Sequence, residues 1–200
     1  MLRIHGSARS RALRTLWMVG ELGLEYEHND LLPRSPGTRT PEFLALNPNA
    51  RVPVIEDDGF VLAESMAINL YLAKKHGKLT PSGARNEALA WQWSLWETDR
   101  LDRQIVTYAN HSAVLPDSER NPALAKAMWD EITPALDVLE IALKQAPWLA
   151  GDDFTVADLN VASALYRGLI LDLGKWPAVN AWLHKCWDRP AAKRARAMRE

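Results

Sequence analysis

The chain has 200 residues, 48% of them hydrophobic, which is enough for one large or two small domains with a substantial core. Lys and Arg number 24 and Asp and Glu number 25, so the net charge of -1 argues against nucleic acid or an anionic membrane as the main partner. The single cysteine, Cys186, rules out an intramolecular disulfide and a cysteine zinc site. The 5 histidines lack metal-ligand spacing, so we expect no metal.

The chain also lacks the usual signs of export or membrane insertion. Its first residues lead directly into a predicted strand, so we expect no signal peptide. No apolar run approaches the roughly 20 residues that a membrane-spanning helix needs. The expected location is the cytoplasm.

The first residues predict a strand–helix–strand unit. Residues 2–5 are a short apolar strand, and residues 6–10 form a loop. Residues 11–23 have apolar positions at i, i+3, i+4 and i+7, which is helical spacing, and Gly23 fits the position just after the helix. Residues 24–31 are the second strand. This order favours a parallel pair of strands.

The next stretch predicts a hairpin that leads into a helix. Residues 52–55 are an apolar, β-branched run, Asp58-Gly59 is a strong hairpin-turn signal, and residues 60–62 form the return strand. Helical spacing then continues over residues 64–76. The remaining elements of this half are a loop over residues 32–40 and a short helix over residues 41–46.

Two features of the hairpin and helix could bind a ligand. Pro53 cannot donate a hydrogen bond to a neighbouring strand, so it marks an interrupted strand end with a possible cis peptide bond. The backbone N–H and C=O of Val52 are then available to an extended ligand. Glu64 and Ser65 add a carboxylate, a hydroxyl and the N–H groups of a helix start. A ligand with an amino-acid head and a peptide-like tail fits this set, and a plain hairpin with a capped helix is the alternative.

The second half of the sequence is predicted to be entirely helical. Thr80-Pro81-Ser82-Gly83 is the best linker, and we place domains at residues 1–79 and 86–200 with a linker at 80–85. Thr155 and Asp158 have the spacing of a capping box, and Pro134 either kinks its helix or begins a new one. The tryptophans Trp91, Trp93 and Trp96 cannot share one helix face, so at least one should meet the N-terminal domain or a partner subunit. The predicted helices cover residues 86–112, 123–146, 155–171, 176–187 and 190–198.

Several short motifs occur in an order that resembles a known family. They are Leu2 to Ile4, Ser10 with Arg14, Pro41 to Pro48, Val52-Pro53, Glu64 to Ile68 and Phe154 to Asp158. The set, which covers nearly the whole chain, resembles a cytosolic glutathione S-transferase of a bacterial type. The resemblance implies an α/β thioredoxin-like N-terminal domain, an all-α helical C-terminal domain and a homodimer. It also implies glutathione as co-substrate and conjugation of its thiol to small hydrophobic electrophiles.

The reaction requires a group that favours thiolate. A thiol with a pKa of about 8.5 is only a few per cent ionised at neutral pH. The family usually places Ser, Tyr or Cys in the first loop, but here the strict catalytic position falls on Arg9, with Ser10 one residue later. Ser10 is our first candidate for catalysis, with Arg9 sharing the role and Ser7 as a weaker choice. Ser10 could instead be only a helix N-cap.

The resemblance also implies the binding residues. Those expected to hold glutathione are Arg39, Arg51, Val52, Pro53, Glu64, Ser65 and, across a dimer, Asp99. Those expected in the electrophile pocket, each with a structural alternative, are Trp96, Arg103, Tyr108 and His111. Two other functions stay open: a non-catalytic glutathione-binding or dimerisation module, and a glutathione-dependent isomerase or disulfide reductase.

Overall fold

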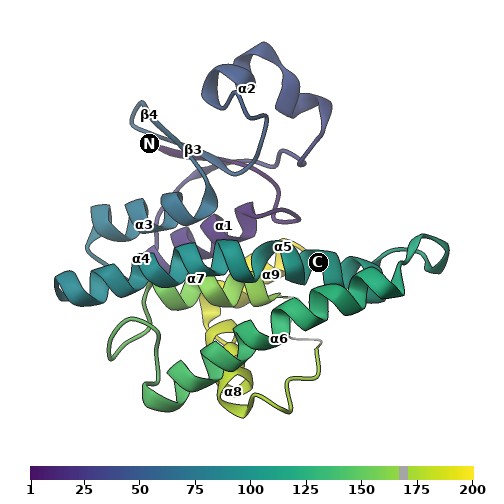
Figure 1. The fold of residues 1–200 in the computed structure, drawn as a ribbon. Helices are drawn as coiled ribbons and strands as arrows, with labels where there is room; N and C mark the ends of the chain where they lie inside the picture. The colour runs from purple at the N-terminus through teal and green to yellow at the C-terminus, as the bar shows by residue number, and fades with distance from the viewer. Residues whose placement is uncertain (167–170) are drawn as a thin grey trace. The chain divides into compact units, whose positions relative to one another are not determined.

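The computed structural model describes residues 1–166 and 171–200 (Figure 1). The chain forms two compact units. Unit 1 comprises residues 1–80 together with 188–200, and unit 2 comprises residues 81–187. Each unit has its own buried core. None of the described helices is long and apolar enough to cross a membrane.

Unit 1 is built on a four-stranded mixed sheet in the order β2-β1-β3-β4. Strands β1 (Leu2–His5) and β2 (Glu27–Asn29) are parallel, which confirms the predicted pairing. Strands β3 (Val54–Asp57) and β4 (Phe60–Ala63) form the predicted antiparallel hairpin, and β3 also pairs antiparallel with β1. The second strand is three residues long, shorter than predicted, because only residues 27–29 pair with β1.

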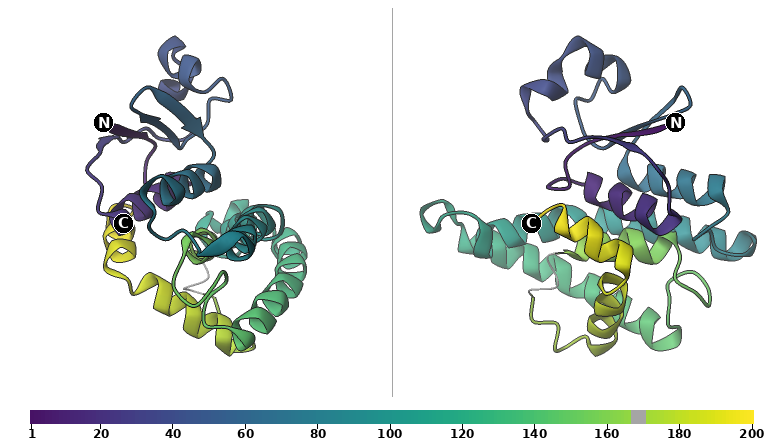
Figure 2. Two further views of the ribbon diagram at one scale, coloured as in Figure 1. Left: turned by 90° about the vertical axis from the view of Figure 1, so that its left-hand side faces the viewer. Right: turned by 180° about the vertical axis from the view of Figure 1, so that it is seen from behind.

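Helices cover both faces of this sheet (Figures 1 and 2). Helices α1 (Ala12–Leu22) and α3 (Ser65–His76) lie on one face, and α2 (Pro41–Leu46) lies on the other. A short 3-10 helix, η1 (Pro36–Arg39), precedes α2 where the sequence predicted a loop. Gly23 after α1 and Gly77 after α3 adopt left-handed conformations, and the sequence predicted the first of these two helix ends. Large apolar side chains that are fully buried in this unit are Ile4, Trp17, Met18, Ile55, Ile68 and Leu72.

The last helix, α9 (Pro190–Ala197), packs against α1 (Figure 2). A Cβ on Gly20 of α1 would lie 3.2 Å from the Cβ of Ala191, so the two helices approach closely there. Arg189 also forms a two-pronged ion pair with Glu21, with nitrogen–oxygen distances of 2.8 and 2.7 Å. Residues 188–200, which the domain prediction assigned to the second half of the chain, thus pack with unit 1.

All regular secondary structure among the described residues of unit 2 is helical. Its helices are α4 (Gly83–Arg100), α5 (Asp102–Ala109), α6 (Pro122–Gln145), α7 (Val156–Ala164) and α8 (Pro177–Trp187). A π-helical turn, η2 (Asn110–Val114), and a 3-10 turn, η3 (Asp117–Glu119), connect α5 to α6. Fully buried large side chains of this unit include Leu101, Ile105, Ile132, Leu136, Leu139 and Leu159.

The prediction of one long helix over residues 86–112 was wrong. The backbone of Leu101 leaves helical geometry, with φ of -125° and ψ of -43°, and divides the helix into α4 and α5. Its N–H still donates to Glu97 and its C=O still accepts from Ile105, so the helix bends without losing these hydrogen bonds. The bend coincides with complete burial of the Leu101 side chain. Periodicity does not reveal it, because the apolar stripe continues through the bend.

Two further predictions concern helix ends. The helix predicted over residues 123–146 is continuous, with Pro134 inside α6. The helix predicted over residues 155–171 ends earlier, at Ala164, and residues 167–170 of that range lie outside the described part of the chain. The capping box at its start is confirmed, since Thr155 and Asp158 exchange the hydrogen bonds that the spacing predicts.

Candidate functional site

The loop after β1 can approach the hairpin because Gly6 has no side chain. Gly6 has a φ of +139°, a backbone conformation that strongly favours glycine. A Cβ at this position would lie 2.8 Å from the Cβ of Ala12 and 3.1 Å from that of Val52. Its N–H donates to the carbonyl of Asn29, and its carbonyl accepts from the ring of His28. The candidate catalytic loop is therefore held next to Val52 and Pro53.

The three candidate thiolate-stabilising residues lie in one hydrogen-bonded turn. The Ser10 hydroxyl donates to the carbonyl of Ser7 at 2.7 Å and accepts from the Ala12 N–H at 3.1 Å. The Ser10 N–H also donates to the Ser7 carbonyl. The Ser7 hydroxyl accepts from the Arg9 N–H at 3.3 Å, and the Arg9 side chain is exposed. In this arrangement Ser10 has the capping contact that the alternative interpretation predicted.

Val52 and Pro53 lie just before β3, not within it. The predicted cis peptide bond joins them. Neither the N–H nor the C=O of Val52 has a hydrogen-bond partner among the described residues. Arg51 is exposed beside them, and its carbonyl accepts from the side chain of Asn47 at 2.9 Å. This strand end therefore offers one donor and one acceptor to an extended ligand.

The start of α3 combines an unusual backbone with a buried ion. Glu64 is exposed and has a φ of 71° and a ψ of 112°, a conformation that costs a non-glycine residue on the order of 1–3 kcal/mol. Next to it, Ser65 is buried, and its hydroxyl accepts from the guanidinium of the buried Arg14 at 3.3 Å. Asn69 donates to the Arg14 carbonyl. In the sequence, Arg14 was noted only as part of the family resemblance, and its contact with Ser65 was not predicted.

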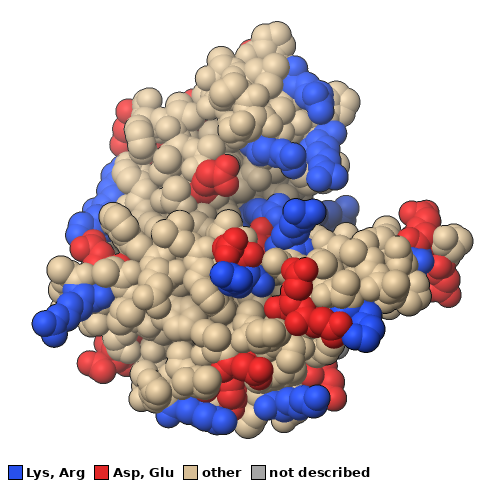
Figure 3. All heavy atoms as spheres, viewed as in Figure 1, with Lys and Arg blue, Asp and Glu red and all other residues tan. Residues whose placement is uncertain are grey.

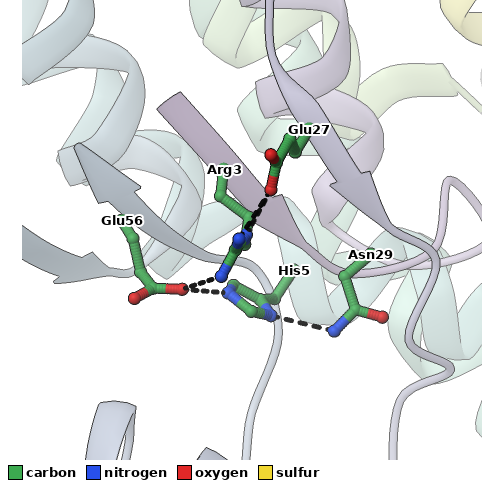
Figure 4. Close-up of polar contacts among 5 residues, drawn as sticks. All are labelled: Arg3, His5, Glu27, Asn29 and Glu56. Atoms are coloured by element: carbon green, nitrogen blue, oxygen red, sulfur yellow. Dashed lines mark hydrogen bonds and ion pairs between the residues drawn. The ribbon is translucent and has the colours of Figure 1, made fainter. Parts of the chain in front are cut away.

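A polar cluster supports β1, the strand that precedes the candidate catalytic loop (Figure 4). The ring of His5 lies between Glu56, at 2.8 Å, and Asn29, at 3.0 Å. Arg3 pairs with Glu27 at 2.7 Å and with Glu56 at 3.5 Å. The pairing with Glu27 is the largest cause that raises the pKa of the exposed Arg3. The cluster ties β1 to β2 and β3, which fixes the end of β1.

The remaining glutathione candidates make few contacts. Arg39 is exposed at the end of η1, in unit 1. Asp99 is exposed in unit 2, where its carboxylate pairs with Arg100 at 2.9 Å. On the face drawn in Figure 3, both basic and acidic side chains occur, in line with the net charge of -1. No group of three or more His, Cys, Asp or Glu that could hold a metal ion occurs among the described residues.

The four electrophile-pocket candidates all lie in unit 2, and three of them have contacts there. Trp96 packs edge-on against Trp93, with ring centroids 5.1 Å apart. Tyr108 packs against Trp129 at 5.0 Å. The ring of His111, the third candidate, accepts from the Asn121 N–H at 3.2 Å. The fourth candidate, Arg103, is exposed.

Comparisons with known proteins agree with this architecture. The family model described as Glutathione S-transferase, N-terminal domain, matches residues 5–74, and the model described as Glutathione S-transferase, C-terminal domain, matches residues 103–190. Glutathione S-transferase D7 of Anopheles gambiae is 32% identical over 178 residues, which cover 86% of this chain and 79% of the relative. Disulfide-bond oxidoreductase YfcG of Escherichia coli strain K12 is 33% identical over 171 residues, which cover 80% of this chain and 77% of that relative.

A solved structure is similar over almost the full length. The theta class glutathione S-transferase from Xanthomonas axonopodis pv. citri, with glutathione bound, has a TM-score of 0.90 and 29% sequence identity, and the match covers 97% of this chain and 96% of that one. The fold is thus a thioredoxin-like α/β unit with an all-α unit. The chain belongs to the cytosolic glutathione S-transferase family. The predicted family, fold class and enzyme class, a glutathione transferase, are confirmed. The serine type of its loop stays a prediction.

Proposed function

We propose that this protein ionises the thiol of glutathione and transfers it to small hydrophobic electrophiles, as a homodimer in the cytoplasm. The observation that carries the proposal is the unpaired backbone of Val52 beside cis-Pro53. Its N–H and C=O suit the backbone of the cysteinyl residue of glutathione. Gly6 brings the candidate catalytic loop next to this strand end, so the thiol of a ligand bound there would be close to the loop.

The two ends of glutathione find complementary groups. The exposed Glu64 carboxylate suits the ammonium of the γ-glutamyl head, and the hydroxyl and N–H groups at Ser65 suit its carboxylate. The strained conformation of Glu64 supports a functional role, because such strain occurs mainly where a side chain must be aimed. Arg39 and Arg51 are the proposed partners of the glycine carboxylate. Asp99 is proposed to reach the γ-glutamyl amine across the dimer.

We assign thiolate stabilisation to Ser10, with help from Arg9. Lowering the thiol pKa by two units needs roughly 2.7 kcal/mol, which a hydroxyl donor, a cation and the start of α1 could supply together. For this the Ser10 proton must turn from the Ser7 carbonyl to sulfur. The Ser7 hydroxyl is the alternative donor, because its own proton has no acceptor among the described residues.

The transfer itself needs no further reagent. The thiol proton goes to water, and the thiolate then attacks the electrophilic carbon and forms a C–S bond as a leaving group such as halide departs with its electron pair. Trp96, Arg103, Tyr108 and His111 are the proposed electrophile-pocket residues. The Tyr108 hydroxyl could donate to the leaving group or to an oxyanion.

Exposed apolar side chains support the proposed homodimer. Trp91 is 59% exposed and Leu95 is 71% exposed, and they lie four residues apart on one face of α4. Phe60 and Val61 are also exposed, on β4. Adjacent exposed apolar side chains on one face, such as Trp91 and Leu95, are typical of an interface. The sequence had predicted that at least one of three nearby tryptophans meets another surface.

The test is a calorimetric titration with glutathione at several pH values. Wild type should release protons near pH 7, and Ser10→Ala should bind more weakly and release fewer. Ser118→Ala, a change of the same kind in the exposed turn η3, is the control and should match wild type. Proton release that is lost in Ser7→Ala but kept in Ser10→Ala would move the role to Ser7. No binding by wild type would contradict the proposal.

Turnover rates with different substrates then distinguish a transferase from a disulfide reductase. A transferase should turn over aryl halides faster than disulfides. The similarity to a disulfide-bond oxidoreductase makes the reductase a specific second candidate. The one cysteine of the chain, Cys186, is fully buried in α8 of unit 2, so a reductase would have to use glutathione itself as the exchanging thiol. Binding without turnover of either substrate would indicate a binding module.

A further inference from the structure

Arg199, which follows α9, reaches the candidate catalytic loop from the far end of the sequence. Its guanidinium donates to the carbonyl of Ala8 at 3.0 Å, across 191 positions of sequence. Ala8 is 1% exposed, so this carbonyl is hardly accessible to water. Both residues belong to unit 1. The close contact between Gly20 and Ala191 and the Arg189 ion pair hold α9 against α1 and thereby fix the position of Arg199.

The accepting carbonyl belongs to a peptide unit that contacts a candidate donor. The same peptide unit contributes the Arg9 N–H, which donates to the hydroxyl of Ser7 at 3.3 Å. The Ser7 carbonyl in turn accepts both the N–H and the O–H of Ser10. The charge of Arg199 polarises the peptide between Ala8 and Arg9 and so strengthens the hydrogen bond from the Arg9 N–H to the Ser7 hydroxyl. Arg199 therefore acts directly on the peptide that holds the Ser7 hydroxyl, and it reaches Ser10 only through the backbone of the same turn.

We propose that Arg199 is a positioning residue for the catalytic loop: it fixes the peptide between Ala8 and Arg9 and adds positive charge behind the site of the thiolate. This inference rests on the proposed function. Without the hydrogen bond to Arg199, the peptide could rotate and the Ser7 and Ser10 hydroxyls would lose their orientation. The thiolate would then be less stable, although the groups that bind the two ends of glutathione, at α3 and at η1, would be unchanged.

Several other charged or titratable groups surround this loop, so charge loss alone must be controlled. They are Arg9 in the loop, Arg11 and Arg14 at the start of α1, and His28, whose ring donates to the Gly6 carbonyl. Arg194→Met is the matched control. It removes the same group from an exposed position of α9, and the Arg194 side chain has no hydrogen bond or ion pair to the described residues.

The experiment is a pH titration of enzyme-bound glutathione, followed by the ultraviolet absorbance of the thiolate and by the pH profile of kcat/KM. Arg199→Met should raise the apparent thiol pKa by about half a unit to one unit, while the dissociation constant measured well above that pKa changes less than about twofold. Arg199→Lys should restore part of the shift, because lysine keeps the charge and can donate to a carbonyl. Arg194→Met should titrate like wild type. Thermal melting checks that all variants fold.

The outcomes are distinct. A thiol pKa in Arg199→Met equal to that of wild type would overturn the inference and leave the proposed function intact. The same pKa shift in Arg194→Met would also overturn it, because the effect would then be general charge loss. A fall in melting temperature or kcat without a pKa shift would reduce Arg199 to a structural contact. Absence of an acid-shifted thiol in wild type would instead remove the proposed function on which the inference rests.

Discussion

Replacing Asp158 by alanine should destabilise the protein far more than loss of an ordinary helix cap. The carboxylate is fully buried and accepts four hydrogen bonds. Two come from the N–H and hydroxyl of Thr155, at 3.0 and 3.2 Å. The others come from the Leu149 N–H and the Trp182 indole N–H, each at 3.0 Å. One side chain thus joins the loop after α6, the start of α7 and the middle of α8.

The size of this destabilisation depends on the buried donors that lose their acceptor in Asp158→Ala. Loss of an exposed cap typically costs about 1 kcal/mol. Alanine at position 158 leaves three buried N–H groups unpaired, each costing about 1–3 kcal/mol, although relief of the buried charge offsets part of this. We expect a loss of about 4 kcal/mol in the free energy of unfolding. Asp158→Asn should lose about half as much, because its amide oxygen can still accept from Leu149 and Trp182 but its NH₂ faces the Thr155 donors.

Urea denaturation followed by tryptophan fluorescence measures these losses. Asp153→Ala, the same change in the exposed loop nearby, should stay within about 0.5 kcal/mol of wild type. A loss near 1 kcal/mol in Asp158→Ala would refute the reasoning. It would mean that the bonds to Leu149 and Trp182 add nothing to the local cap.

Three further changes test other parts of the structure. Glu64→Gly should be about 1 kcal/mol more stable than Glu64→Ala, because glycine accepts a φ of 71°, while both weaken glutathione binding; equal unfolding curves would argue against backbone strain. Trp91→Glu should yield monomers in sedimentation, whereas the adjacent exposed Gln92→Glu should not; a Trp91→Glu dimer would remove this helix face from the proposed interface. Burial alone would raise the pKa of the Asp57 carboxyl. Hydrogen bonds from Lys75 and Tyr71 outweigh this effect and hold that pKa below its usual value. Asp57 therefore stabilises the fold above about pH 4 and loses this contribution as the pH falls through its lowered pKa. Lys75→Met should flatten that acid dependence in thermal melts, and an unchanged profile would contradict the assignment.

Local sequence signals were reliable wherever one or two residues determine the backbone. The Asp58-Gly59 pair predicted the hairpin turn between β3 and β4, because both residues must adopt positive φ and few residue pairs do so readily. Gly23 predicted the end of α1 for the same reason. Thr155 predicted the start of α7, because its capping partner lies only three residues away. These interactions form within a few residues, so the sequence contains all the information that they need.

The sequence also predicted some features of the candidate binding residues. Pro53 predicts an interrupted strand because it lacks an N–H, and the backbone of Val52 has no hydrogen-bond partner among the described residues, as predicted. The sequence did not predict that Glu64 has a positive φ, because glutamate normally avoids it. It also did not predict that the Ser10 proton is bonded to the Ser7 carbonyl. Hydroxyl orientation depends on the whole turn, not on residue type.

Tertiary structure alone decided which distant segments meet. The sequence by itself determined the type of secondary structure in each half of the chain, mixed α/β in the first and helical in the second, because hydrophobic periodicity is a local property. It did not show that residues 188–200 pack with unit 1, since the pattern of an amphipathic helix does not specify which surface the helix will cover. The contacts of Arg14 with Ser65, of Arg199 with Ala8 and of Asp158 with Trp182 depend on helices brought together by burial of their apolar faces. Such contacts carry no sequence signature, because the hydrophobic effect that creates them is not directional.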